Sequence, residues 1–172
     1  MKVNSFCLAS LLTLCTFSVS ANDVSFSIGG GYPYFVIPEV SLSANEGTQR
    51  WYANYKLGLN DGFSLGFEHA LTANKKHALG LVIGAIGIRD DERECVKTDD
   101  DSISGEVGNI IGCAITDAFD YETTNGAGVS YSYLFRGLNE GGWRVRFELG
   151  YGEGIDSNEK RADGGISVSY EF

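Results

Sequence analysis

The chain contains two histidines, His69 and His77, which are the first side chains to consider for catalysis. A nucleophilic mechanism needs a histidine within hydrogen-bond reach of a serine or an acid. The two histidines flank a short polar segment, Thr72 to Lys75, which is typical of a turn. No serine lies within a strand-neighbour distance of either histidine in the sequence. We therefore expect no catalytic group and predict that the protein is not an enzyme.

Two further segments could bind ions or phosphate. Asp99 to Asp101 offer carboxylate oxygens to a divalent cation, but their spacing does not match an EF-hand and the required glycine is missing. A solvated acidic loop is the simpler interpretation, and calcium binding stays the alternative. Gly29 to Gly31 lack the strand-to-helix context of a phosphate-binding loop, so we interpret them as a turn. The sequence thus predicts no metal site and no cofactor.

The N-terminal segment has the pattern of an export signal. Lys2 precedes an apolar run from Phe6 to Val19, and Ala21 is a small residue at a suitable cleavage position. The run is shorter than the roughly 20 residues of a membrane-spanning helix. We expect residues 1–21 to be a cleaved signal peptide and residues 22–172 to form one domain.

Two cysteines remain in the exported part of the chain. Leu14 precedes Cys15, where lipid attachment needs a small residue, so a lipoprotein is not expected. Cys95 and Cys113 lie in the exported part, and an oxidising compartment favours a disulfide between them. A metal-binding pair is the alternative, although the sequence has no CxxC motif and no histidine near either cysteine.

The composition indicates strands and an acidic surface. The formal net charge is -10 at pH 7, which disfavours a nucleic-acid partner because phosphate binding needs positive charge. The chain has 23 glycines and two prolines, and 12% of its residues are aromatic, as in chains of many strands joined by tight turns.

Apolar and polar residues alternate with period two along most of the chain. A first count gives seven strands, and dividing the N-terminal region at Gly29 to Tyr34 gives eight, the even number that bacterial membrane barrels have. Pro38 lies inside one of them and cannot donate to a strand ladder. The expected strands begin near Val24, Val36, Arg50, Phe63, Ala78, Gly128, Trp143 and Ile166.

Eight strands place the short turns at one end and the long connections at the other. The short turns are Ala44 to Gly47, Thr72 to Lys75 and Gly137 to Gly141. The connections Asp90 to Thr124 and Glu153 to Asp163 are longer and lie at the opposite end. This asymmetry is the one expected for an outer-membrane barrel, with short periplasmic turns and long outside loops.

The two faces of the strands differ in chemistry. Large aromatic residues lie near strand ends on the apolar face, as interfacial girdles require: Trp51, Tyr131, Trp143, Tyr151, Tyr170 and Phe172. The other face carries small residues and charges of both signs, which we expect to pair in a narrow lumen. These lumen charges are Glu39, Arg50, Lys56, Glu68, Arg136, Arg144, Arg146, Glu148 and Glu171. A soluble barrel with its charges facing water is the alternative.

The last strand carries a motif that resembles a known signal. Its alternation ends on Tyr170, Glu171 and Phe172, which is similar to the C-terminal end of outer-membrane barrels read by the barrel assembly machinery. Over the whole exported chain the plan resembles the OmpA/OmpX-type barrels, without a peptidoglycan-binding extension. The resemblance implies an all-β, eight-stranded antiparallel transmembrane up-and-down barrel in the cell outer membrane, a monomer in contact with outer-membrane lipid and lipopolysaccharide.

The expected function is structural, or an interaction at the cell surface through the outside loops. The acidic segment from Asp90 to Thr124 is too long for a simple hairpin and is the expected place for that interaction. A narrow pore, a lipid A-modifying enzyme and a soluble periplasmic carrier barrel are the alternatives. The enzyme is disfavoured because His69 and His77 fall at the predicted periplasmic end, whereas lipid A lies in the outer leaflet.

Overall fold

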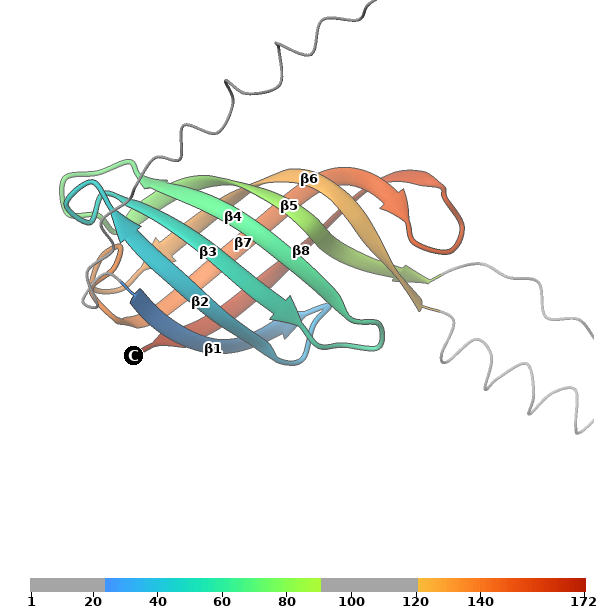
Figure 1. Cartoon of the computed structure of the whole chain (residues 1–172), viewed down its shortest axis with the longest axis horizontal. Helices are drawn as coiled ribbons and strands as arrows, with labels where there is room; N and C mark the ends of the chain where they lie inside the picture. Colours follow the sequence, from blue (N-terminus) through green and yellow to red (C-terminus); the bar gives the residue numbers. More distant parts are fainter. Residues whose placement is uncertain (1–23, 91–120) are drawn as a thin grey trace, which may run out of the picture.

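The computed structural model describes residues 24–90 and 121–172. Eight antiparallel strands, each paired with its neighbours in sequence, form a barrel that closes between the first strand and the last (Figure 1). The predicted fold of eight antiparallel strands in one barrel is confirmed. The strands are β1 (Val24–Tyr32), β2 (Ile37–Ala44), β3 (Gln49–Lys56), β4 (Gly62–Ala70), β5 (His77–Asp90), β6 (Tyr121–Leu134), β7 (Gly142–Gly154) and β8 (Lys160–Glu171).

The two ends of the barrel are built differently. The turn end carries the connections β2–β3, β4–β5 and β6–β7, and the loop end carries β1–β2, β3–β4 and β7–β8. In the β2–β3 connection Asn45, Glu46 and Gly47 have φ angles of 47°, 54° and 75°. Asn and Gly tolerate this left-handed conformation, which explains why the chain reverses here.

The predicted turn at Gly29 to Gly31 is wrong. These glycines do not form a turn: they lie inside β1 and pair with Ser169, Val168 and Ser167 of β8. A Cβ on Gly31 would lie 2.0 Å from the carbonyl oxygen of Ile166, so neighbouring backbone occupies the space of a side chain. Glycine is required here for close strand approach at the barrel seam, and the chain turns only after Tyr32.

The second half of the barrel projects beyond the first at the loop end (Figure 1). Strands β5 to β8 have 12 to 14 residues, whereas β1 to β4 have eight or nine. In this projecting sheet Nη2 of Arg89 on β5 donates to the carbonyl of Ala162 on β8 at 3.3 Å, so strands that are not neighbours in the barrel contact each other. The connections expected at Asp90 to Thr124 and Glu153 to Asp163 are therefore shorter than predicted, since the flanking strands continue into them.

A bulge changes the direction of side chains in β5. Its pairing with β6 shifts between Ala85 and Gly87, and Ile86 lies fully buried inside the barrel. A Cβ on Gly150 of β7 would lie 2.5 Å from Cδ1 of Ile86. The extra residue of the bulge thus points an apolar side chain into the space that Gly150 leaves open.

Candidate functional site

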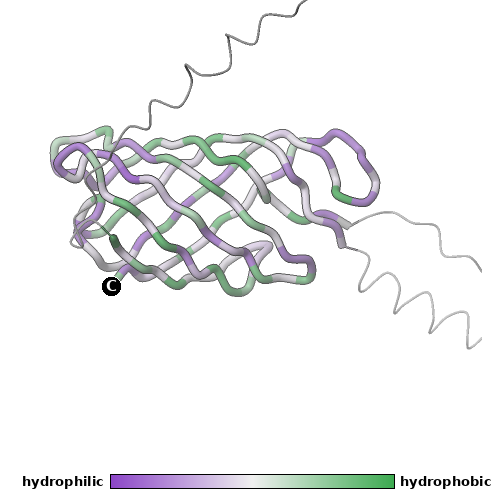
Figure 2. Tube along the Cα trace, in the orientation of Figure 1, coloured by the Kyte–Doolittle hydropathy of each residue, from purple (hydrophilic) through white to green (hydrophobic). Residues whose placement is uncertain are grey.

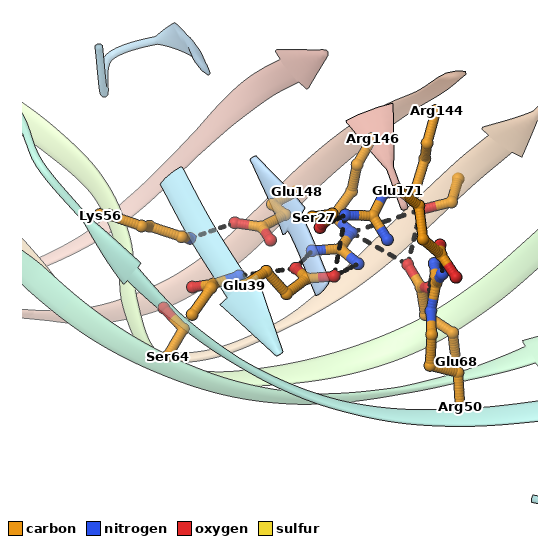
Figure 3. A network of polar contacts seen from close by, with 12 residues as sticks. Ser27, Glu39, Arg50, Lys56, Ser64, Glu68, Arg144, Arg146, Glu148 and Glu171 are labelled. Atoms are coloured by element: carbon orange, nitrogen blue, oxygen red, sulfur yellow. Dashed lines mark hydrogen bonds and ion pairs between the residues drawn. The ribbon is translucent and has the colours of Figure 1, made fainter. Parts of the chain in front are cut away.

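The barrel interior contains a network of buried charged residues. Of the nine predicted lumen charges, eight point inward, and the side chains of Arg50 and Glu68 are completely buried. Figure 3 shows these side chains converging from strands on opposite sides of the barrel. The eight are Glu39, Arg50, Lys56, Glu68, Arg144, Arg146, Glu148 and Glu171.

Arg50 joins two carboxylates across the seam. Its Nη2 lies 2.6 Å from Oε2 of Glu68, its direct cross-strand neighbour on β4. Its Nη1 lies 2.6 Å from Oε2 of Glu171 on β8. Hydrogen bonds between ionised groups at this distance are among the strongest in proteins, so Arg50 connects strands that are far apart in the sequence.

Arg146 lies at the centre of the network. Its Nη1 is 2.6 Å from Oε2 of Glu39, and its Nε is 3.0 Å from Oε1 of Glu68. Arg144, two residues earlier on the same face of β7, places Nη2 2.8 Å from the other oxygen of Glu39. The hydroxyl of Ser132 donates to Oε1 of Glu68 at 2.5 Å.

Lys56 forms a second group nearer the loop end. Its Nζ pairs with the carboxylate of Glu148 and donates to the carbonyl of Ala85 at 2.7 Å. The hydroxyl of Ser64 donates to the same carbonyl, also at 2.7 Å. Ala85 lies beside the bulge, where β5 has lost its β4 partner, so side chains replace the missing ladder contacts.

The interior charges balance. Four carboxylates face four cations within the network, and this pairing offsets the several kcal/mol that each buried ion costs alone. Nε and Nη1 of Arg144 and Oδ1 of Asn54 have no partner among the described protein atoms. They line a cavity of about 20 Å³ together with Glu39 and Ser169, which has room for about one water molecule.

Apolar side chains close the interior at both ends of the network. At the loop end Tyr34, Ile37, Ala85 and Ile88 form a buried cluster, and the hydroxyl of Tyr34 donates to the carbonyl of Gly87 at 3.1 Å. The cluster at the turn end consists of Ala78, Leu134 and Leu138. We call these two groups the loop-end plug and the turn-end plug. Tyr34 and Leu138 are not predicted from the sequence, because both lie in connections without periodicity.

Arg136 is the one predicted lumen charge that is not in the lumen. The prediction extended the alternation of β6 to this position, but the strand ends at Leu134. Arg136 is exposed in the connection to β7, where its aliphatic carbons lie close to Gly142. It therefore belongs to the surface of the turn end.

The outer face of the barrel is apolar and exposed. Trp51 is 53% exposed and Trp143 is 56% exposed, although both lie inside strands. Figure 2 shows hydrophobic and hydrophilic positions alternating along the strands. Towards the turn end, aromatic rings contact one another on this face, with Trp143 and Tyr170 centroids 5.3 Å apart and Tyr170 and Phe172 centroids 5.2 Å apart.

The apolar outer face ends within the projecting sheet. Tyr151 is the last large exposed apolar residue inside β7. Beyond it, the outward positions on β6, β7 and β8 are Asn125, Glu153 and Lys160, and Lys160 lies 3.4 Å from Glu153. We call the outward apolar surface of the barrel, from the level of Tyr151 down to the level of Phe172 at the turn end, the apolar belt.

Glu122 organises the loop end above the apolar belt. Its Oε2 accepts hydrogen bonds from the backbone N–H groups of Asp156 and Ser157 at 3.0 and 2.9 Å, and its Oε1 accepts one from the Ser157 hydroxyl at 2.5 Å. Arg161 pairs with the same carboxylate. Burial alone would raise the pKa of Glu122, but the Ser157 and Asp156 hydrogen bonds and the Arg161 charge lower this pKa to about 2.

The two histidines lie at the turn end. Nδ1 of His77 and the hydroxyl of Tyr131 share a hydrogen bond of 2.7 Å, and His69 is exposed on the outer face of β4. Within residues 24–90 and 121–172, neither histidine is hydrogen-bonded to a serine or a carboxylate. The structure therefore brings no nucleophile and base together at these positions.

Several predicted residues lie outside the described part of the chain. They are Cys95 and Cys113 of the predicted disulfide, Asp99 to Asp101, and residues 1–21 of the predicted signal peptide. In the described part there is no group of three or more His, Cys, Asp or Glu side chains placed to hold a metal ion. The same part contains no helix long and apolar enough to cross a membrane.

Comparison of the chain with protein-family models, curated proteins and solved structures found no match. The class is therefore defined by the fold and the interior alone: a closed, eight-stranded antiparallel barrel with an apolar outer face and paired charges inside.

Proposed function

We propose that this protein is an outer-membrane β-barrel of the small OmpA/OmpX-type, with a structural or surface-interaction role through its outer loops. The observation that carries the proposal is its polarity: large apolar side chains are exposed around the barrel, whereas arginines, lysine and glutamates are buried. A soluble protein rarely exposes so continuous an apolar surface. In a bilayer this surface would face hydrocarbon, and the paired charges would be shielded from it.

The apolar belt supports a defined position in the membrane. Its turn-end edge carries Trp143, Tyr170 and Phe172, and its loop-end edge carries Tyr32 and Tyr151. Amphipathic aromatic rings of this kind prefer the two membrane interfaces. With the short turns in the periplasm, the projecting sheet and Glu122 would lie outside the cell.

A soluble carrier barrel is disfavoured by the interior. Such a protein needs an internal ligand cavity and a polar exterior. Here the network side chains occupy the interior that the structure describes, and the cavity beside Arg144 and Asn54 has a volume of about 20 Å³. The loop-end and turn-end plugs, together with the paired network charges, likewise argue against an open pore.

The outer loops are the proposed interaction surface, and among those that the structure describes the β7–β8 connection is hydrogen-bonded to the barrel. The β7–β8 connection is anchored by Glu122, which bonds the backbone of Asp156 and Ser157. Strands β5 and β8, which are not neighbours in the barrel, are joined at this end by the hydrogen bond from Arg89 to Ala162. Among the described residues, the loop end carries an excess of acidic side chains: Asp61, Glu122, Glu153, Asp156, Glu159 and Asp163 against Arg89, Lys160 and Arg161.

Cell fractionation combined with gel mobility tests the proposal. We expect the protein in the outer-membrane fraction, and we expect its electrophoretic mobility to differ before and after boiling, because a folded barrel resists detergent until heated. Recovery from the soluble periplasm, or a mobility that boiling leaves unchanged, would overturn the proposal.

A further inference from the structure

The apolar belt contains a groove across strands β2 to β5. Its volume is about 500 Å³, within the roughly 300–1,000 Å³ range of small-molecule sites. The lining side chains on the outer face are all apolar: Val40, Leu42, Trp51, Ala53, Leu65, Phe67, Leu81 and Ile83.

The groove arises from one small residue in a row of large ones. Ala53 on β3 is flanked in register by Val40 on β2 and Leu65 on β4, and Leu65 is followed by Ile83 on β5. The next row towards the turn end holds Trp51, whose ring centroid lies 4.7 Å from that of Phe67. The missing side-chain volume at Ala53 leaves a hollow, and the paired aromatic rings form its wall.

We propose that this groove binds one acyl chain of a membrane phospholipid. This inference rests on the proposed function, because only a barrel in a bilayer would present the groove to lipid. The lining offers no charged side chain and no free polar side chain on the outer face. A headgroup or a peptide would leave its polar groups unpaired there, at a cost of several kcal/mol. A hydrocarbon chain has no such groups and gains dispersion contacts along the groove.

The position of the groove selects the leaflet. Its two rows of side chains lie in the middle of β3 and towards its turn end, since Trp51 is two residues from Gln49, where the strand begins. With the turn end at the periplasm, the groove extends from the middle of the outer membrane into its inner leaflet. Phospholipid acyl chains are therefore the hydrocarbon that meets the groove.

A second copy of the chain fits the groove poorly. In a two-fold dimer whose axis passes through Ala53 the same patch meets itself, so the hollow would face another hollow. Two concave surfaces leave a void between them, and a void loses the contacts that drive association in membranes. A single acyl chain fills the hollow without this loss.

The two tryptophans allow a direct test, because the chain has only Trp51 and Trp143 and they are almost equally exposed. Trp143→Phe leaves Trp51 in the groove wall as the one fluorophore. Trp51→Phe leaves Trp143, which lies on β7 outside the groove. Each variant is reconstituted in phosphatidylglycerol vesicles that contain an increasing fraction of lipid with brominated acyl chains, which quench nearby tryptophan.

We expect bromine to quench the fluorescence of Trp51 more strongly than that of Trp143 at low brominated fractions. The quenching of Trp51 should also depend on the acyl-chain length of the competing unbrominated lipid, whereas the quenching of Trp143 should not. Ala53→Phe in the Trp143→Phe background should remove this excess, and Ala53→Leu should reduce it. Val168→Phe places the same phenyl ring on the exposed outer face of β8 and should leave the excess unchanged. Heat-modified gel mobility checks that each variant is folded.

Each other outcome identifies a different error. Equal quenching of Trp51 and Trp143, or excess quenching that survives both Ala53 substitutions in folded protein, would overturn the acyl-chain site. If Trp51 alone is protected from quenching, protein covers the groove, and this result would also overturn the acyl-chain site. If neither tryptophan is quenched and the protein does not float with the vesicles, the proposed membrane location itself is wrong.

Discussion

The guanidinium of Arg146 stacks on the ring of Tyr52, with 3.9 Å between its Cζ and the ring centroid. The same guanidinium bonds Glu39 and Glu68, so one side chain of β7 holds partners on β2, β3 and β4. The hydrogen bonds lie in the plane of the guanidinium and the aromatic contact lies on its face, which is the geometry that arginine offers and lysine does not. Arg146 therefore acts as a brace across the barrel.

Arg146→Leu should destabilise the folded barrel by about 3–5 kcal/mol, because it leaves the buried carboxylates of Glu39 and Glu68 undercompensated. Urea unfolding in lipid vesicles, followed by tryptophan fluorescence, measures this loss. Arg136→Leu is the matched control: Arg136 is exposed in the connection after β6, and its loss should change stability by no more than about 0.5 kcal/mol. Equal effects of the two substitutions would show that the network contributes nothing.

Gly66→Ala should destabilise the barrel by about 1–3 kcal/mol through overpacking. A Cβ on Gly66 would lie 2.1 Å from Cζ of Tyr52, and this ring cannot retreat because Arg146 is stacked on it. Tyr52→Leu removes the ring that the new methyl group would meet. The double variant Gly66→Ala/Tyr52→Leu should therefore lose less unfolding free energy than the sum of the losses in the two single variants. The double-mutant cycle is measured by the same unfolding experiment, and additive behaviour would contradict the clash.

The alternation of residues was sufficient to predict the inside and the outside of the barrel, because period two leaves each strand residue only two directions. In Trp143 to Tyr151 the charged face is the interior face throughout. The rule fails at Ile86, where the bulge inserts one residue and reverses the alternation. It also fails at Arg136, because the pattern does not reveal that the strand ends two residues earlier.

Other features depend on contacts that no local pattern encodes. A glycine such as Gly31 is compatible with a turn and also with a strand that is crowded by neighbouring backbone. The sequence does not show which of the two applies, because the crowding comes from a part of the chain that only the fold brings close. Tyr34 and Leu138 close the ends of the interior from connections, where side-chain direction has no period. The bonds of Glu122 to the β7–β8 connection join segments more than 30 residues apart, so only the folded sheet brings them together.

The carboxylate of Glu122 should titrate with a midpoint at unusually low pH. Its folded pKa is about 2, below the ordinary value of 4.5. The carboxylate therefore stabilises the β7–β8 connection fully above about pH 5, and this stabilisation is lost as pH falls through the folded pKa. The amide resonance of Ser157, whose N–H bonds Glu122, should report a midpoint near pH 2 by NMR. Glu122→Gln should abolish that titration, and a midpoint near 4.5 in the unmodified protein would contradict the assignment.

Replacing the histidines should not change the lipids of the cell. His77 bonds Tyr131 and lies near the turn end, where no serine or carboxylate is hydrogen-bonded to it among the described residues. We expect His69→Ala and His77→Ala to leave the mass spectrum of lipid A identical to that of cells with the unmodified protein. A lipid A species that requires the protein and disappears with either substitution would restore the enzyme hypothesis.

The protein should not conduct ions steadily in a planar bilayer. An ion would have to pass the turn-end plug, the paired charges around Arg146 and the loop-end plug, and the cavity beside Arg144 has a volume of only about 20 Å³. Removing one plug with Tyr34→Ala or Leu138→Ala should still give no conductance steps, because the paired charges fill the lumen beneath it. Steady steps from the unmodified protein would mean that these charge pairs separate in the membrane. Steps that appear only with Tyr34→Ala would instead identify the loop-end plug as the single barrier.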